Sequence, residues 1–208
     1  MDDWKKLRKQ QRTHLIARRA AVTEKDFHHW GEAITASLQQ GFPVLQKSSI
    51  GLYWPIQGEY DPRPAMNCFL QCGATLALPT VINKHSPLYF SQWWPDAPLK
   101  KGAFNIPVPD NTAPVAIDAV IMPMVGFDRQ GYRLGYGSGL FDRTLAAMNP
   151  QPLVIGIAFE LLYLDSVNPQ PHDIPMEFIV TEAGIYQSTK KGLVLISTAE
   201  CALKNAAR

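Results

Sequence analysis

The residues of this chain best suited to chemistry form a glycine-rich segment between two arginines. Glycines alternate with other residues over 135–139, Arg133 and Arg143 lie on either side, and Asp142 follows the last glycine. Glycine lets a backbone approach a ligand closely and adopt positive φ, so successive N–H groups can face an anion. The arginines can donate to phosphate oxygens, and a carboxylate can hold a divalent cation. The segment therefore suits a phosphate with a metal ion, although the glycines alone are equally consistent with a tight structural turn.

The spacing distinguishes this segment from three known glycine motifs. Its Gly-x-Gly-x-Gly order differs from the GxGxxG of dinucleotide-binding loops, and it lacks the lysine of a P-loop after the last glycine. Tyr136 stands two residues before Ser138, where a nucleophile elbow needs glycine. The sequence therefore favours an anion-binding loop of another kind.

Two other segments carry carboxylates that could act in a site. Glu59 and Asp61 come after an expected strand and a proline, where they could bind polar ligand groups or tune a proton; Asp61 could equally cap a helix. His172 and Asp173 lie in a proline-flanked loop. There Asp173 could be a second metal ligand and His172 a proton carrier, or both could serve as loop caps.

Basic residues are concentrated near the start of the chain. A helix expected over residues 4–21 places Lys5, Arg8, Arg12 and Arg19 within about 60° of one another, because each residue turns the helix by about 100°. Such a face can bind an anionic ligand or can simply be solvated.

Length and composition indicate an ordinary globular protein. The chain has 208 residues, of which 46% are hydrophobic and 18% charged, which suits one large domain. Its net charge of +2 argues against a dedicated nucleic-acid binder. Three cysteines without a second pair at metal-ligand spacing indicate a reduced, cytoplasmic protein. No apolar run reaches the ~18 residues of a membrane span, and no secretory leader is expected.

The order of elements predicts a parallel sheet. A buried strand, the glycine segment, a helix and a second buried strand form a βαβ unit, whose strands are expected to be parallel. Ligands in such sheets bind beyond the carboxyl ends of the strands, where the glycine segment would lie. The chain from 92 to 116 is rich in proline and is expected to be a long loop. The other expected elements are helices at 23–41, 61–71 and 139–148 and strands at 50–53, 75–78, 88–91, 119–122, 153–158 and 178–181.

The glycine segment belongs to a longer run with a family resemblance. Residues 125–143 closely resemble the signature of the 5-formyltetrahydrofolate cyclo-ligases, also called methenyltetrahydrofolate synthetases. The resemblance continues, in the same order and spacing, through residues 53–61, 101–107, 172–175 and 179–182. It covers the chain from about residue 3 to about residue 185.

The resemblance implies a fold and an activity. The fold is a single three-layer α/β domain of CoA-transferase-like architecture, with a largely parallel, mixed central sheet and helices on both faces. It would occupy residues 1–188, with residues 189–208 as a C-terminal extension of unassigned role. The activity is ATP- and Mg²⁺-dependent conversion of 5-formyltetrahydrofolate to 5,10-methenyltetrahydrofolate with release of ADP and phosphate, through a phosphorylated formyl (imidate) intermediate. A cytoplasmic monomer acting on small molecules, with neither nucleic acid nor membrane as partner, is expected.

The resemblance also implies residue roles. Glu59, Arg133 and Asp142 would be catalytic, and Asp142 and Asp173 would bind Mg²⁺. The folate would contact Tyr53, Glu59, Phe104 and Phe141. ATP would contact Lys5, Arg8, Arg12, Arg133, Leu134, Gly135, Tyr136, Gly137, Ser138, Gly139, Leu140, Phe141 and Asp142.

Three positions depart from the family pattern. Ser138 stands where the family often has lysine, Leu140 replaces the first residue of an aromatic pair, and Trp4 replaces a helix lysine. These departures leave two alternatives open. One is a related ATP-dependent ligase acting on another heterocycle, and the other is a folate- or nucleotide-binding regulator without catalysis.

Overall fold

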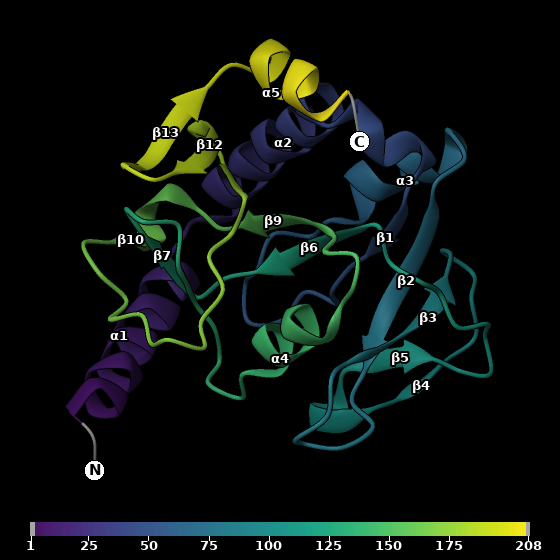
Figure 1. Cartoon of the computed structure of the whole chain (residues 1–208), viewed down its shortest axis with the longest axis horizontal. Coiled ribbons are helices and arrows are strands. Elements are labelled where there is room, and N and C mark those ends of the chain that lie inside the picture. Colours follow the sequence, from purple (N-terminus) through teal and green to yellow (C-terminus); the bar gives the residue numbers. More distant parts are fainter. Residues whose placement is uncertain (1–2, 207–208) are drawn as a thin grey trace.

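The computed structural model describes residues 3–206. Residues 1, 2, 207 and 208, at the outer ends of the expected domain and extension, lie outside the described residues. Between them the chain forms a central sheet covered by helices (Figure 1).

The central sheet has eight strands in the order β13-β12-β11-β9-β6-β1-β2-β3. The five inner strands pair in parallel, and the remaining strands run antiparallel at the two edges. Inner strands are covered on both faces and so consist of continuous apolar runs; β9, for example, is buried at all five positions. The strands are β1 (Ser49–Gly51), β2 (Thr75–Thr80), β3 (Tyr89–Trp93), β6 (Ala119–Pro123), β9 (Leu153–Ile157), β11 (Phe178–Thr181), β12 (Gly184–Thr189) and β13 (Gly192–Ile196).

Helices cover both faces of the sheet, which confirms the predicted three-layer α/β fold. Figure 1 shows α2, α3 and α5 on one side and α4 with α1 on the other. Thr23 caps α2 as expected, because its Oγ1 accepts from the Asp26 N–H at 3.1 Å. The helices are α1 (Asp3–Ala20), α2 (Glu24–Gly41), α3 (Arg63–Gln71), α4 (Leu140–Ala147) and α5 (Thr198–Asn205), with short 3-10 turns at Pro43–Lys47, Ala103–Asn105 and Glu160–Leu162.

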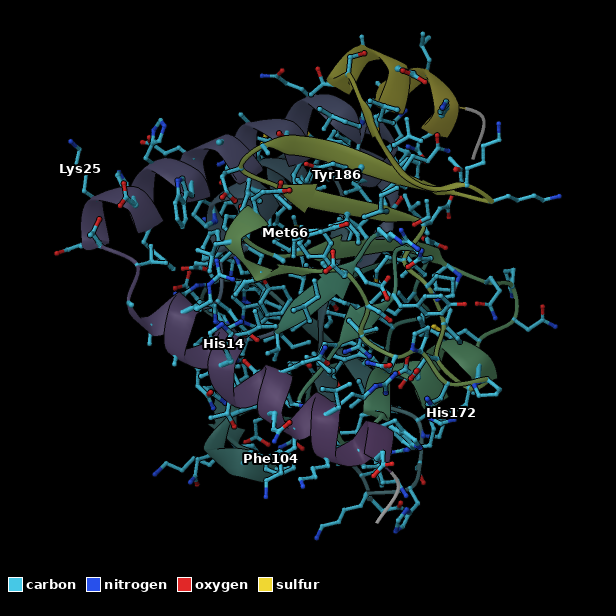
Figure 2. The ribbon with its side chains drawn as sticks, turned by 90° about the vertical axis from the view of Figure 1, so that its left-hand side faces the viewer. His14, Lys25, Met66, Phe104, His172 and Tyr186 are labelled. Carbon is cyan, nitrogen blue, oxygen red and sulfur yellow. The ribbon has the colours of Figure 1, made fainter. Side chains whose placement is uncertain are left out.

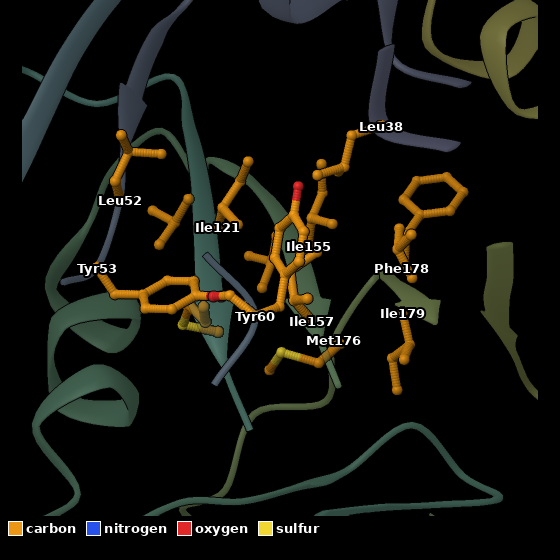
Figure 3. Packing of buried hydrophobic residues seen from close by; sticks show 14 of the residues in the cluster. Leu38, Leu52, Tyr53, Tyr60, Ile121, Ile155, Ile157, Met176, Phe178 and Ile179 are labelled. Atoms are coloured by element: carbon orange, nitrogen blue, oxygen red, sulfur yellow. The ribbon is translucent and has the colours of Figure 1, made fainter. Parts of the chain in front are cut away.

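Part of the hydrophobic core lies between the sheet and α2. Figure 3 shows Leu38 of α2 above strand residues such as Ile121 and Ile155, with Phe178 and Ile179 of β11 beside them. The ring of Phe178 packs edge-on against that of Phe42, with 5.4 Å between ring centroids. Both rings are almost fully buried, so this pair joins the end of α2 to the sheet.

Replacing Phe178 with alanine should lower the free energy of unfolding by about 3–5 kcal/mol, because the ring is lost and a cavity remains. Urea denaturation would measure the change. The matched control is Leu203→Ala on α5, where the side chain is 78% exposed and the expected change is below about 0.5 kcal/mol. Equal effects of the two substitutions would contradict the packing described for Phe178.

Two regions contain more regular structure than the sequence indicated. The stretch 92–116 is not a structureless loop, because β4 (Leu99–Lys101) and β5 (Pro107–Pro109) form an antiparallel hairpin within it. All three residues of β4 are exposed, so the strand has no apolar alternation that could reveal it. The expected boundary at residue 188 falls inside β12, and β13 and α5 continue the sheet and its helical cover.

The parallel pairing of β6 with β9 confirms the predicted βαβ unit. The strands β7 (Gly126–Asp128) and β8 (Arg133–Leu134) are inserted between β6 and α4, and they form a small second sheet with β10 (Tyr163–Leu164), which follows β9. Because β8 leads directly to the glycine segment, this insertion carries the segment to the carboxyl edge of the parallel strands.

Candidate active site

The glycine loop, residues 135–139, joins β8 to the start of α4. Gly137 and Gly139 have φ of +98° and +64°, a backbone conformation that favours glycine. A Cβ on Gly135 would lie 2.4 Å from Nη1 of Arg133, and one on Gly137 would lie 3.1 Å from Nη2 of Arg12. The glycines therefore allow two guanidinium groups to pack directly against the loop backbone.

Arg133 and Asp142 form an ion pair across the mouth of this loop. Nη2 of Arg133 lies 2.8 Å from Oδ2 of Asp142, with the side chains 7% and 16% exposed. The guanidinium also lies 5.5 Å from the ring centroid of Phe141. Within residues 3–206, Nε of Arg133 is buried and has no hydrogen-bond partner. A buried donor without an acceptor is uncommon, and at this position an anionic ligand would satisfy it.

Helix α1 brings further positive charge to the loop. Nε of Arg12 donates to the carbonyl oxygen of Gly135 at 2.8 Å. Burial, followed by the nearby charge of Arg8, lowers the pKa of Arg12. Two guanidinium groups close enough to repel each other are stabilised by an anion between them.

Arg8 connects α1 to the loop that contains Asp173. Its guanidinium forms an ion pair with Asp173, and its Nε donates to the carbonyl oxygen of Val167 at 2.9 Å. The ring of Trp4 lies against the Arg8 guanidinium, 5.2 Å from the ring centroid. Nζ of Lys5 lies 5.3 Å from the same ring centroid. Figure 2 shows the neighbouring His172 exposed near the N-terminal half of α1. The predicted residues Lys5, Arg8 and Asp173 therefore lie together.

The Arg8–Asp173 pair should make stability depend on pH. Burial alone would raise the pKa of Asp173, but hydrogen bonds from Arg8 and from the Gln170 N–H hold it below its usual value. A carboxyl whose pKa is lowered by folding stabilises the protein above its unfolded pKa, and this stabilisation is lost as the pH falls through the folded value.

Asp173→Asn should therefore lower the free energy of unfolding by about 1–3 kcal/mol at pH 7, with the difference shrinking below about pH 4. Urea denaturation at several pH values would measure it. Asp61→Asn is the matched control, because Asp61 pairs with Arg63 at a more exposed site, where an ion pair contributes less than about 1 kcal/mol. A deficit of Asp173→Asn that stays constant with pH would count against this ion pair.

Glu59 lies in a buried hydrogen-bond cluster that reaches the glycine loop. Its Oε1 accepts from the hydroxyl of Tyr136 at 2.7 Å, and its Oε2 accepts from the Ile56 N–H at 2.9 Å. Burial raises the pKa of Glu59, whereas these two hydrogen bonds and the charge of Arg19 act in the opposite direction. Nη2 of Arg19 donates to the same Tyr136 hydroxyl at 2.7 Å.

The other residues predicted to contact folate differ in how much of the side chain a ligand could reach. Tyr53 is buried, and its hydroxyl donates to the carbonyl oxygen of Tyr60 at 2.8 Å, so only its ring remains for a ligand. Figure 3 shows these two tyrosines side by side in the core. Phe141 is partly buried beneath Arg133. Phe104 lies on the turn between β4 and β5 and is 71% exposed.

Arg143 connects the glycine loop to a neighbouring segment of the chain. Its Nη2 donates to the carbonyl oxygens of Ser138 at 2.7 Å and Lys84 at 2.8 Å. It therefore ties the segment after β2 to the glycine loop, and these donors are not directed at a phosphate.

Sequence reasoning missed two buried charged residues in and beside the candidate site. Arg19 was placed on the basic face of α1 without a role, yet it is 3% exposed and reaches the Glu59 cluster. Asp128 is fully buried and accepts from the N–H groups of Gln130, Tyr132 and Val167, which fixes the β7–β8 turn and the loop bound by Arg8. Only the position of Asp128 within the resembling run could have drawn attention to it.

Metal-binding carboxylates are few. Among the described residues, no group of three or more His, Cys, Asp or Glu side chains could hold a metal ion. Arg8 donates to both oxygens of Asp173, and the Gln170 N–H donates to Oδ2. Among the described residues, Oδ1 of Asp142 has only a 3.5 Å contact with the Ile174 N–H. This contact also brings the Asp173 loop against Asp142. In the same part of the chain, no helix is long and apolar enough to cross a membrane.

Together these features define an α/β enzyme with an arginine-lined glycine loop at the carboxyl edge of a parallel sheet, the place where ligands bind in such folds. The chain belongs to the 5-formyltetrahydrofolate cyclo-ligase family, whose sequence profile matches residues 4–182. The match agrees with the resemblance found in the sequence.

Several relatives share most of their length with this chain. The 5-formyltetrahydrofolate cyclo-ligase of Haemophilus influenzae is 28% identical over 177 residues, which cover 81% of this chain and 94% of the relative. That of Escherichia coli K12 is 27% identical over 180 residues, covering 82% and 97%.

Solved structures show the same fold. The NMR structure of Aquifex aeolicus 5,10-methenyltetrahydrofolate synthetase matches with a TM-score of 0.76 and 29% identity, covering 91% of this chain and 96% of that one. A 5,10-methenyltetrahydrofolate synthetase from Mycoplasma pneumoniae matches with a TM-score of 0.70 and 24% identity, covering 88% and 99%, and shows the fold alone.

Proposed function

We propose that this chain catalyses the ATP- and Mg²⁺-dependent conversion of 5-formyltetrahydrofolate to 5,10-methenyltetrahydrofolate, with release of ADP and phosphate. The observation that carries the proposal is the buried, unpartnered Nε of Arg133 beside a glycine loop, in a member of the cyclo-ligase family. This arrangement supplies the positioning and the charge neutralisation that phosphoryl transfer requires.

The phosphates of ATP would bind at the glycine loop. The N–H groups between Leu134 and Asp142 lie at the start of α4, where the helix dipole favours negative charge. Arg133 and Arg12 lie directly against this loop, and Arg8 contributes its charge from the same face of α1. Arg133 is the best placed to donate to the transferring phosphoryl group.

The carboxylates of Asp142 and Asp173 are suited to Mg²⁺ if most of the other ligands of the ion come from outside the protein. Mg²⁺ is commonly held by one or two carboxylates together with substrate phosphates and water. Asp142 offers its Oδ1 for this purpose, while Asp173 would have to exchange a hydrogen bond for the metal. The ion would neutralise charge on the phosphates, and Arg133 would hold Asp142 in place.

The folate would bind between the glycine loop and Glu59. Glu59 can accept hydrogen bonds from N–H groups of the ring, and Tyr53 and Phe141 offer aromatic surface nearby. Phe104 would have to move onto the ligand from an exposed turn. The formyl oxygen would then attack the γ-phosphorus atom and displace ADP. N10 would attack the formyl carbon and lose its proton, and the bond from that carbon to the phosphorylated oxygen would break to release phosphate as the ring closes.

The absorbance of the methenyl product tests the proposal directly. Purified protein should form the chromophore from 5-formyltetrahydrofolate only when ATP and Mg²⁺ are both present. No product at saturating ATP and Mg²⁺ would refute it. The departures at Ser138 and Leu140 favour testing a related heterocycle as a substrate as well. Tight folate binding without ADP release would indicate a regulator. Weak competition by folates would indicate a ligase that acts on another substrate.

The monomeric state, the cytoplasmic location and the absence of nucleic-acid and membrane partners stay predictions from the sequence.

A further inference from the structure

We infer that Arg19 and Tyr136 are positioning residues for Glu59, through a hydrogen-bond chain that joins the glycine loop to the folate site. The inference rests on the proposed function, because it assigns a task to two residues around the proposed folate-binding carboxylate.

The chain is continuous from a buried cation to a buried carboxylate. Nη2 of Arg19 donates to the hydroxyl of Tyr136, and that hydroxyl donates to Oε1 of Glu59, each over 2.7 Å. The remaining guanidinium nitrogens of Arg19 donate to the carbonyl oxygens of Gln57 at 3.0 Å and Met124 at 3.2 Å. Arg19 is therefore held rigidly, and its charge reaches Glu59 through one hydroxyl group.

Burial makes this connection necessary. Glu59 is 5% exposed and Arg19 is 3% exposed, and a buried charge is costly unless it is compensated. The cavity beside them, lined in part by Tyr53 and Tyr60, has a volume of about 10 Å³. That is room for about one water molecule, so the carboxylate has little space for another orientation.

Tyr136 also couples two parts of the site. Its backbone lies between Gly135 and Gly137 in the proposed phosphate loop, whereas its hydroxyl contacts the proposed folate carboxylate. Any displacement of the loop that moves this hydroxyl away removes the link between Arg19 and Glu59.

The groups that face Glu59 give the direction of a pH effect. These groups are Arg19, Tyr53, Tyr60 and Tyr136. Burial raises the pKa of each of the three tyrosines, which therefore stay neutral at ordinary pH, and that of Tyr60 rises to about 12. Arg19 is the cation of the group, and its charge and the Tyr136 hydrogen bond both favour the ionised form of Glu59.

Tyr136→Phe is the test, because it keeps the ring and removes only the hydroxyl group. NMR titration of protein with ¹³C-labelled glutamate, with Glu59 assigned from Glu59→Gln, should show the pKa of Glu59 rising by about 1. In steady-state kinetics the KM for 5-formyltetrahydrofolate should rise about tenfold, with the KM for ATP changing less than about twofold. The acid limb of kcat/KM for the folate should move to higher pH.

Tyr163→Phe is the matched control, since Tyr163 is 40% exposed against 38% for Tyr136 and lies outside the cluster. It should change none of these quantities. An unchanged Glu59 pKa in Tyr136→Phe, or an equal rise in both KM values, would overturn the inference. The NMR titration needs no substrate, so a protein that shows the pKa change but no turnover would refute the proposed function separately.

Discussion

Arg133→Ala is expected to lower kcat for methenyltetrahydrofolate formation by about 10³-fold. Arginines that stabilise a transferring phosphoryl group contribute about 10³–10⁵ to the rate, and Arg133 packs against the loop with its Nε buried and without a hydrogen-bond partner among the described residues. The loss should fall on kcat more than on the KM for the folate, because the contact strengthens as charge develops on the phosphoryl oxygens. The absorbance assay at saturating substrates measures it.

The control for this substitution is Arg129→Ala, an exposed arginine on the turn between β7 and β8, which should leave kcat within about twofold. Because Arg133→Ala leaves Asp142 without its partner, urea denaturation should accompany the kinetics. Arg133→Lys keeps the charge but loses the planar, two-pronged set of guanidinium N–H donors, and should recover only part of the rate. A folded Arg133→Ala protein with normal kcat would exclude Arg133 from phosphoryl transfer.

Asp142→Asn is expected to lower kcat by about 10²–10³-fold and to raise the Mg²⁺ concentration needed for half-maximal rate. The substitution keeps the size of the side chain but removes the charge proposed to hold the metal ion and to pair with Arg133. Because the side chain is partly exposed, the loss of stability should be smaller than the loss of activity. Rates measured across a Mg²⁺ titration separate the two effects.

Asp110→Asn is the control for the charge change, since Asp110 pairs with Lys100 on an exposed hairpin and should affect neither kcat nor the Mg²⁺ requirement. If Asp142→Asn lowers kcat without altering the Mg²⁺ dependence, Asp142 acts by holding Arg133 and not by binding the metal. Unchanged kcat would remove Asp142 from the site altogether.

Much of the fold could be predicted from local patterns. The inner strands are continuous apolar runs, Thr23 is a capping residue at the start of an amphipathic helix, and the βαβ unit follows from element order. The hairpin at 99–109 could not be predicted, because β4 is exposed at every position and prolines interrupt the run. Such strands form because their backbones hydrogen-bond to each other, and backbone pairing does not require an alternation of buried and exposed side chains in the sequence.

The sequence by itself determined the glycine loop, its place after a strand and before a helix, and the family to which the chain belongs. These features depend on residue types at short spacing, which a linear pattern records. Only the tertiary structure decided which charges pair. Arg8 meets Asp173 across 165 positions because α1 packs beside the loop that contains Asp173. Tyr136 meets Glu59 across 77 because the order of strands in the sheet brings their loops to one edge. Arg19 entered the site in the same way: burial of one face of α1 turned a basic side chain toward Tyr136.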